Sequence, residues 1–426
     1  MIISILYCLI LKLIGQSTIE NKMKSSKKMQ ELPQEFFHKI CVIGGGLTGA
    51  IMLLLLKKSN LFKKNEIAWI KPKEKKQSDL RTTFYNPTSI ELLKNLSLID
   101  NLNYNDYSKV NQIKVFGVKG SSPLVWNCSG LETPLGLVVK NEVILNTLDN
   151  LLNDIPCYDG IVTNTDSDEY ERTLYLNNKK SIKSHLVLSA DGKNSYLRNL
   201  LSIKTIEKKT KHVAVSGFLE QSNKHNSKAI QAFTELGPIG ILPYGNNKVV
   251  NFVQSIEKVK LNSILTQKKP ETYLCQNLND FFIDTELSFM PIEKIQNIKN
   301  KLSIWDLDLN LVTNPTAKRA ILIGDAAHSI HPLAGQGLNL ALRDCVSVIK
   351  AIKNSFKFGN DLGDQAILDF YRKDRLPHTV SMTGFTDFLF YGFTSTSVKT
   401  KSFLSKGMEK LNQTDAKDIF KIFASI

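Results

Sequence analysis

A glycine-rich loop between an apolar strand and an apolar helix constrains the fold of this chain more than any other feature. The run Lys39–Ile43 has the length and β-branched content of a buried parallel strand. It leads into the loop Gly44-Gly45-Gly46-Leu47-Thr48-Gly49, and a helix is predicted over Ala50–Leu56. This is the G-x-G-x-x-G pattern between strand and helix, the setting that gives the pattern meaning. The sequence therefore predicts an α/β fold with a dinucleotide site at the start of this helix.

Each glycine of the pattern has its own physical task. We expect Gly44 to permit the tight turn, Gly46 to let the backbone approach a pyrophosphate, and Gly49 to let the helix pack closely on the sheet. The free N–H groups and positive dipole of the first helical turn favour phosphate there.

The second predicted strand, Ile67–Ile70, ends without the residue that such a site usually has. An acidic side chain is expected there to accept the ribose hydroxyls, and Lys71 stands in its place. An ammonium has donors and no acceptor, so it cannot make that bond. Either Glu74 or a backbone carbonyl replaces the acceptor, or adenosine binding is weakened. A preference for a 2′-phosphorylated nucleotide also explains a cation here, but the later motifs argue against it.

A third apolar strand, Leu186–Ala190, ends in Asp191-Gly192. Asn194 or Ser195 can cap the helix that follows. An Asp-Gly pair after a strand is usually just a turn, so its value depends on the other motifs.

The most informative stretch begins at the strand Ala320–Ile323 and continues as Gly324-Asp325-Ala326-Ala327-His328-Ser329-Ile330-His331-Pro332-Leu333-Ala334-Gly335-Gln336-Gly337-Leu338-Asn339 before an apolar helix. A strand, an acidic residue and a glycine-rich loop opening a helix suit a polyol chain beside a flat ring. Asp325 can accept hydrogen bonds from ribityl hydroxyls. The amides of Gly335–Gly337 can stabilise negative charge on a reduced flavin ring.

A metal site is the alternative for this stretch, because Asp325, His328 and His331 are spaced three apart. Pro332 and the glycine-rich loop argue against one continuous helix presenting all three, and no further ligand cluster stands nearby. We therefore expect no metal.

Together these segments resemble the class A flavin monooxygenases, and most of all the ubiquinone-biosynthesis hydroxylases. The resemblance covers about residues 38 to 393 and includes Asp79-Leu80-Arg81, Gly136–Val139, Gly237–Pro243 and Leu368–Arg375, with Asp387 downstream. The stretch from Gly324 is the specific one, whereas the others are shared with many flavoproteins. Lys71 and Lys140 depart from the acidic residues that the family usually has.

The resemblance implies FAD as cofactor and hydroxylation of an aromatic ring through a flavin C4a-hydroperoxide. It implies that Arg81 and Asp191 lie near the flavin or the pyrophosphate, and that Pro332 lies near the reaction face; Arg81 can equally be a solvated surface residue. Arg81 and Pro332 are thus the predicted catalytic residues. The predicted cofactor-binding residues are Gly44, Gly46, Gly49, Arg81, Asp191, Gly192, Gly324, Asp325, Gly335, Gln336, Gly337, Leu338 and Asn339.

All three motifs must meet at one cofactor, which predicts a discontinuous FAD-binding Rossmann-like domain of the GR2 type. We assign to it residues 36–105, 140–205 and 313–360. Alternating apolar and polar residues predict an interleaved antiparallel-sheet substrate domain over 106–139 and 206–312. The region 363–426 is predicted to be helical. Residues 1–35 are predicted to be a disordered lead, or to precede the true start of the protein at Met23 or Met29.

Composition sets the remaining limits. The formal charge of +15 comes from lysines spread along the chain, with no nucleic-acid motif beside them, so we expect no nucleic acid. Cys41 and Cys345 fall in apolar segments and are expected to be buried thiols in a reducing compartment. The apolar run Met1–Ile14 is too short to span a membrane. We therefore expect a cytoplasmic protein, with peripheral contact to the inner face of an anionic membrane as an open alternative.

The expected reaction partners are a prenylated phenol and dioxygen, with NAD(P)H or a ferredoxin-type protein as electron donor. Contact with other quinone-pathway enzymes is a further expectation. Three alternatives stay open: a class A enzyme acting on another substrate, a flavin reductase of isoprenoid double bonds, and a non-catalytic FAD-binding scaffold.

Overall fold

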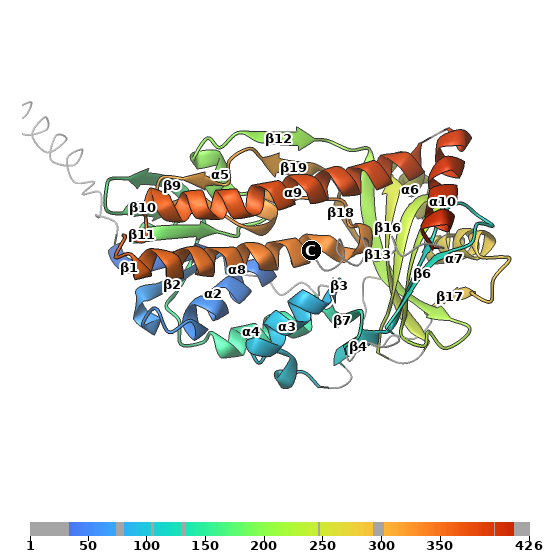
Figure 1. The fold of residues 1–426 in the computed structure, drawn as a ribbon, viewed down its shortest axis with the longest axis horizontal. Coiled ribbons are helices and arrows are strands. Elements are labelled where there is room, and N and C mark those ends of the chain that lie inside the picture. Colours follow the sequence, from blue (N-terminus) through green and yellow to red (C-terminus); the bar gives the residue numbers. More distant parts are fainter. Residues whose placement is uncertain are drawn as a thin grey trace, which may run out of the picture.

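The computed structural model describes residues 34–73, 81–103, 106–128, 133–245, 248–292, 302–395 and 397–412. Most of the predicted lead lies outside these residues, but positions 34 and 35 already belong to the first strand. Glu74, one of the alternative ribose acceptors, also lies outside them. Figure 1 shows a sheet with its helices at one end of the molecule and a second sheet at the other, joined by a long helix.

The first sheet has eight strands and a parallel centre, in the order β20-β21-β11-β1-β2-β8. Its parallel strands are β1 (Gln34–Ile43), β2 (Ile67–Lys71), β8 (Cys157–Asp159), β11 (Lys180–Ser189) and β21 (Ala320–Leu322). Its antiparallel strands are β9 (Val162–Ser167), β10 (Arg172–Leu176) and β20 (Thr316–Ala317). The central strands are apolar on both sides because both faces of the sheet are covered.

Alternation along β1 explains the two covers. Ile40 and Val42 join a core built with the helices, whereas Cys41 and Ile43 join a second core with residues of β9 and β10. The helices whose residues contribute to the first core are α2 (Leu47–Lys58), α3 (Pro87–Asn95), α4 (Asn141–Leu151), α8 (Gln336–Lys357) and the start of α9 (Gln365–Thr394). The short α5 (Tyr196–Leu200) contributes Leu197 to the second core.

The second large sheet is mostly antiparallel, in the order β17-β13-β16-β15-β14-β5-β6, with β18 also on β13. Its strands are β5 (Gln112–Phe116), β6 (Leu124–Asn127), β13 (His212–Gln221), β14 (Lys228–Thr234), β15 (Gly237–Pro243), β16 (Val249–Glu257), β17 (Phe289–Pro291) and β18 (Leu302–Asp306). Among the described strands of this second sheet, only β14 and β5 pair in parallel. Helices α6 (Lys258–Leu265) and α7 (Pro270–Phe281) cover one face, called the outer face below.

Two three-stranded sheets and several short turns complete the described connections. One sheet contains β3 (Thr82–Tyr85), β7 (Gly136–Lys140) and β4 (Tyr107–Val110), and the other contains β12 (Thr205–Lys208), β19 (Leu309–Val312) and β22 (His328–Ser329). The 3-10 turns are η1 (Lys64–Glu66), η2 (Ile99–Asn101), η4 (Gly324–Ala326) and η5 (Leu333–Gly335).

The long helix α9 (Gln365–Thr394) joins the two large sheets (Figure 1). Near its start, the Tyr371 hydroxyl donates a hydrogen bond to the Leu322 carbonyl at the end of β21 (2.8 Å). Near its end, Phe393 stacks on Phe233 of β14, with ring centroids 3.8 Å apart. Helix α10 (Val398–Asn412) follows, and Met408 packs in the same cluster.

The predicted fold class is confirmed: a mixed α/β protein with a helical C-terminal region. The domain boundaries proposed from the sequence stay a prediction. Cys41 and Cys345 are fully buried, and this burial raises the pKa of both thiols. Within the described segments, no helix has both the length and the apolar character needed to cross a bilayer.

Candidate cofactor site

Three parallel strands bring the three sequence motifs to one edge of the sheet. Ile43 at the end of β1 is paired with Ser189 of β11, which is paired with Leu322 of β21. The Ala190 N–H donates to the Ile43 carbonyl (2.7 Å), and the Ile323 N–H donates to the Ser189 carbonyl (2.9 Å). Gly44, Asp191 and Gly324 follow these positions, so the structure brings together segments far apart in the chain.

The glycine loop is as tightly packed as its sequence predicts. Gly44 has a φ of 122°, and a Cβ there would lie 2.1 Å from the Ala190 carbonyl oxygen. A Cβ at Gly49 would lie 2.4 Å from the Gly44 carbonyl oxygen. Because neither position has room for a side chain, these glycines let the turn and the helix lie against the ends of β1 and β11.

Gly46 differs, because a Cβ there meets no atom of the described residues within 4 Å. It is the N-cap residue of α2, and no side chain in the described part of the chain caps this helix. The first turn of α2 therefore presents backbone N–H groups beside an open surface, the arrangement that binds phosphate groups.

Asp325 lies in η4, next to the start of α2. A Cβ at Gly324 would lie 3.0 Å from the Thr48 side chain, which shows how closely η4 approaches α2. The Asp325 side chain is exposed to solvent. Nevertheless, dense protein around it raises the pKa of its carboxyl, while the charges of His328, Arg81 and Lys193 oppose that shift. The exposure of Asp325 and the raised pKa of its carboxyl together indicate a carboxylate that is surrounded by protein but open to solvent on one side.

The loop before α8 provides a second uncapped helix start. Gly335 has a left-handed φ of 64° as N-cap, and among the residues that the structure describes no side chain caps α8. A Cβ at Gly337 meets no described atom within 4 Å, whereas Gln336 is buried and Leu338 is half-buried. Within the described segments, the backbone N–H groups at this helix start therefore also have no capping side chain.

Asn339 has a structural task in this loop. Its amide nitrogen donates to the Phe84 carbonyl (2.8 Å) and the Gly335 carbonyl (2.9 Å), and its amide oxygen accepts from the Asn86 N–H (3.1 Å). These bonds hold the loop against β3. Direct contact of Asn339 with a cofactor stays a prediction.

Asp191 makes protein contacts with both carboxylate oxygens. It accepts from the Ser189 hydroxyl (2.5 Å) and from the Leu197 N–H (3.3 Å). Ser195, one of the two predicted caps, accepts from the Arg198 N–H (3.0 Å) and so caps α5. Gly192 has open space around its Cβ position.

Arg81 and Pro332 approach the site from the side of the second sheet. The Arg81 guanidinium lies 5.8 Å from the centre of the Trp305 ring, and its positive charge acts on Asp325. Pro332 is half-buried and directly precedes η5, which packs against β15 and β3. The structure therefore places both predicted catalytic residues between the two sheets.

A buried ionic cluster behind the site was not predicted from the sequence. Asp344 on α8 is fully buried; it accepts from His328 Nε2 (2.6 Å) and from the Gly324 N–H (2.9 Å) through one oxygen. Its other oxygen accepts from Arg375 Nε on α9 (2.9 Å). Burial disfavours the charged carboxylate, but His328 and Arg375 hold the pKa of Asp344 below its ordinary value. The signal that could have revealed it was an acidic residue among the apolar residues of α8, because a buried charge needs a partner.

The two histidines have different surroundings, which bears on the metal alternative. His328 is bonded to Asp344, whereas His331 stacks on Phe390 with ring centroids 3.8 Å apart. Burial, together with Lys208 and His212, lowers the pKa of His331 to about 3 and keeps it neutral. In the described part of the chain, no three His, Cys, Asp or Glu residues are grouped as metal ligands.

Both unusual lysines are engaged in ion pairs. Lys71 Nζ lies 2.9 Å from Asp149 of α4 and 3.7 Å from the centre of the Trp69 ring. Lys140 Nζ lies 2.9 Å from Glu142. The cation at the expected ribose position is therefore partly neutralised by an acidic residue on α4.

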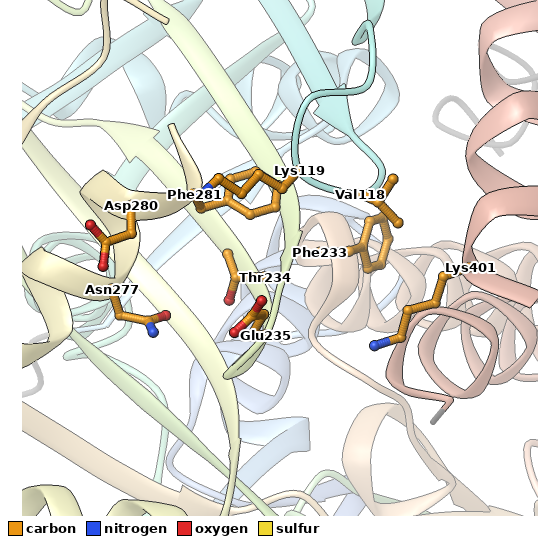
Figure 2. Close-up of a pocket in the computed structure, with 9 residues that line it drawn as sticks. All are labelled: Val118, Lys119, Phe233, Thr234, Glu235, Asn277, Asp280, Phe281 and Lys401. Atoms are coloured by element: carbon orange, nitrogen blue, oxygen red, sulfur yellow. The ribbon is translucent and has the colours of Figure 1, made fainter. Parts of the chain in front are cut away.

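A pocket with a volume of about 430 Å³ is lined by residues of β14, α7 and α10, among others (Figure 2). Lys401 reaches it from α10, and Asn277 and Asp280 line it from α7 (Figure 2). The ring of Phe233, on β14, also lines it. None of the residues that line this pocket belongs to the three motifs.

The residues at the motif edge fit an FAD molecule. Two uncapped helix starts, open glycine positions at Gly46 and Gly337, and the exposed Asp325 carboxylate lie around the ends of three parallel strands. The helix starts match the negative groups of a dinucleotide, and the carboxylate matches hydroxyl donors.

Comparison with known proteins agrees with this chemistry. The family model described as "FAD binding domain" matches residues 38–386. A Dictyostelium discoideum relative named ubiquinone biosynthesis monooxygenase COQ6, mitochondrial, is 24% identical, with 94% of this chain and 95% of that protein covered. The human protein of the same name is also 24% identical, with 83% and 84% covered.

Solved structures show the same fold at lower identity. The p-nitrophenol 4-monooxygenase PnpA from Pseudomonas putida is 15% identical with a TM-score of 0.70, covering 91% of this chain and 97% of PnpA. A mutant of PqsL from P. aeruginosa is 17% identical with a TM-score of 0.71, covering 88% and 100%. The resemblance to flavin monooxygenases and the prediction of FAD are confirmed. The chain belongs to the FAD-binding-domain family of flavin-dependent monooxygenases, and FAD is its cofactor.

Proposed function

We propose that this monooxygenase hydroxylates the aromatic ring of a polyprenylated phenol on the pathway to ubiquinone. The observation that carries the proposal is the match over nearly the full length of both chains to relatives named for ubiquinone biosynthesis. The arrangement of η5 against β15 supports it, because the predicted reaction-face residue Pro332 then lies beside a sheet with an apolar face.

Bound FAD supplies the activation of dioxygen in this reaction. One oxygen atom enters an aromatic C–H bond and the other leaves as water, with two electrons and two protons supplied through NAD(P)H or a ferredoxin-type partner. The chain itself has to bind the cofactor, hold the ring and keep water away from the reacting atoms.

We assign the cofactor contacts on the geometry described above. The start of α2 beside Gly46 would hold the pyrophosphate, and the Asp325 carboxylate would accept hydrogen bonds from the ribityl hydroxyls. The backbone N–H groups at Gly335–Gly337 would stabilise negative charge on the flavin ring, since they lie at a helix start. Asp344 does not touch the cofactor in this proposal; it fixes Gly324 and His328 and so positions Asp325.

Isotope labelling tests the proposed reaction. The FAD-loaded full chain is incubated with 2-farnesylphenol and ¹⁸O₂, with NADH, NADPH or a ferredoxin and its reductase as separate donors. We expect a hydroxylated phenol carrying one ¹⁸O atom, and no label when the ¹⁸O is supplied in water. Mass spectrometry of the quinone precursors that accumulate on gene deletion then identifies the ring position.

Each alternative has its own result in this experiment. A reduced isoprenoid double bond formed without oxygen identifies a reductase, and absence of turnover with any donor identifies a scaffold. Labelled product from an unprenylated aromatic, with none from the farnesylated phenol, identifies a monooxygenase of another substrate.

A prenylated substrate also gives a reason for contact with a membrane surface. Leu404, Met408 and Leu411 of α10 pack in or against the cluster around Phe390 and therefore cover the protein's own core. Phe403, however, is 77% exposed. Exposed lysines accompany it, at positions 406 and 410. We propose that this face of α10 contacts anionic lipid, since apolar and basic side chains together favour such surfaces.

Co-sedimentation with liposomes tests the membrane proposal. We expect the full chain to bind vesicles containing phosphatidylserine, to bind less as salt rises, and to bind several-fold more weakly after Phe403→Ser. Phe358→Ser is the matched control, because Phe358 is 80% exposed but follows α8 at the other end of the molecule. An equal loss of binding in Phe403→Ser and Phe358→Ser contradicts the choice of α10. Equal binding of the wild type to neutral vesicles and to vesicles with phosphatidylserine contradicts it as well.

A further inference from the structure

A row of five paired residues crosses the second sheet on the face opposite α6 and α7, called the inner face below. Successive side chains of a strand point to opposite faces. Ile230 and Ala232 of β14, and Ile239 and Ile241 of β15, all pack in the core under α6 and α7. Gln231 and Gly240 therefore lie on the inner face. The complete row, in the order of strand pairing, is Ser216, Val253, Gly240, Gln231 and Val115.

The inner face is the one that meets the cofactor loop. Leu333 of η5 packs in one cluster with Phe233, the next inner-face residue of β14, and Val115 packs against the same cluster. Strand β15, which contains Gly240, packs directly against η5. The row thus lies beside the loop that carries Pro332.

The middle of the row leaves space beside this loop. Gly240 and Val253 are only half-buried, although they lie in central strands of the sheet. The residues beside them on the outer face, such as Ile241 and Phe252, are buried in the core. A Cβ at Gly240 would meet its nearest atom, Gln231 Oε1, at 3.5 Å. A glycine inside a strand often marks such a close approach of a ligand.

Gln231 supplies a polar group beside this space. Its side chain is 9% exposed, and its Nε2 has no hydrogen-bond partner among the described residues. Buried amides are normally paired, because an unpaired donor loses its bonds to water without replacement. Exchanging the assigned positions of the amide nitrogen and oxygen would still leave one amide atom unpaired.

A second glutamine shows the usual arrangement. Gln254 of β16 is 4% exposed and points to the outer face, where its Nε2 donates to the Thr234 hydroxyl (3.1 Å). The same residue type is therefore paired on one face of this sheet and unpaired on the other. The difference indicates that the partner of Gln231 is a ligand.

We propose that the aromatic ring of the substrate lies over Gly240, between the inner face and η5, and that Gln231 hydrogen-bonds to the oxygen on that ring. Gly240 makes room for the ring, and Gln231 sets which edge of the ring approaches the cofactor. The ligand class is a ring with a phenolic oxygen. This inference rests on the proposed function and adds the residues that orient the ring.

Binding of two matched ligands to the FAD-loaded full chain tests the hydrogen bond. The ligands are 2-farnesylphenol and farnesylbenzene, which differ only in the ring oxygen, and equilibrium dialysis gives both Kd values. We expect the wild type to prefer the phenol by about tenfold, and Gln231→Leu to lose that preference. Gly240→Val should raise the Kd of both ligands, because its side chain fills the space over the strand.

Thermal denaturation separates binding from folding. Gln231→Leu should keep or raise Tm, because it removes an unpaired buried amide. Gln254→Leu is the matched control: its Tm should fall, because it breaks a made hydrogen bond, while its preference for the phenol is retained.

The outcomes distinguish this inference from the proposed function. If the wild type binds neither ligand, both the proposed function and the assignment of Gln231 are wrong. If the wild type prefers the phenol and Gln231→Leu does so equally, only the assignment of Gln231 is wrong. Loss of the preference in Gln254→Leu as well would also overturn it, because the effect would then not be specific to the inner face.

Discussion

Gly44→Ala is expected to prevent stable folding of the cofactor-binding sheet. The added methyl group would lie 2.1 Å from the Ala190 carbonyl oxygen, and the φ of 122° is unfavourable for any residue with a side chain. The oxygen belongs to backbone that is hydrogen-bonded between β1 and β11, so it cannot move away at low cost. We expect a loss of more than about 4 kcal/mol in the free energy of unfolding of the apoprotein, measured by urea denaturation.

Gly46→Ala is the matched control two residues later. Its methyl group meets no atom of the described segments within 4 Å, so the apoprotein should keep its stability within about 0.5 kcal/mol. The methyl group occupies the surface where we place the pyrophosphate, and the Kd for FAD should rise about a hundredfold, or about 2.7 kcal/mol. Unchanged FAD affinity in a folded Gly46→Ala protein would show that the pyrophosphate binds elsewhere.

Asp344→Asn is expected to have the largest effect of any substitution away from the cofactor. It leaves the Arg375 guanidinium buried without a carboxylate, and loss of one partner from a buried pair costs about 3–5 kcal/mol. FAD affinity should fall too, because Asp344 holds the Gly324 N–H and His328. Urea denaturation of the apoprotein and FAD titration measure the two effects separately.

Two controls accompany Asp344→Asn. The double variant Asp344→Asn with Arg375→Met removes both charges and should recover at least half of the lost stability. Asp369→Asn breaks the partly exposed pair between Asp369 and Arg372 on α9 (3.0 Å) and should cost about 0.5 kcal/mol or less. Equal losses for Asp344→Asn and Asp369→Asn would refute the role of burial.

The pH dependence of this cluster has a definite sign. The pKa of Asp344 is lowered in the folded protein, so its contribution to stability is present above the unfolded value of about 3.9. That contribution is lost as the pH falls through the folded pKa. Asp344→Asn should therefore show a weaker loss of stability in acid than the wild type does.

The meeting of the three motifs at one sheet edge could be predicted from the sequence because local patterns encode each motif. The strand before Gly44, the strand before Asp191 and the strand before Gly324 could each be recognised from a short apolar run and the residues that follow it. Parallel strands place their carboxyl ends at one edge, so the meeting of the three motifs followed from the fold class. Ser195 as a cap followed from local preference in the same way.

The parts that were missed depend on contacts between distant segments. Asp344 is one acidic residue in an apolar helix, and its partner Arg375 lies on another helix. The inner face of the second sheet was equally hidden, because the row containing Gln231 exists only once the strand register is known. The bonds that Asn339 makes to the backbone of Phe84, Asn86 and Gly335 were not predicted either, and its contact with the cofactor stays a prediction.

The wide spacing of the three motifs has a consequence for protein synthesis. Gly44 and Asp325 are about 280 residues apart, so at 5–20 residues per second the ribosome makes the first roughly 15–60 s before the second. During that time β11 lacks its neighbour β21, and the apolar α2 lacks α8, against which it packs. The nascent chain therefore cannot assemble the complete flavin site early. Its exposed apolar surface makes it a client for chaperones until the helix that closes the core emerges.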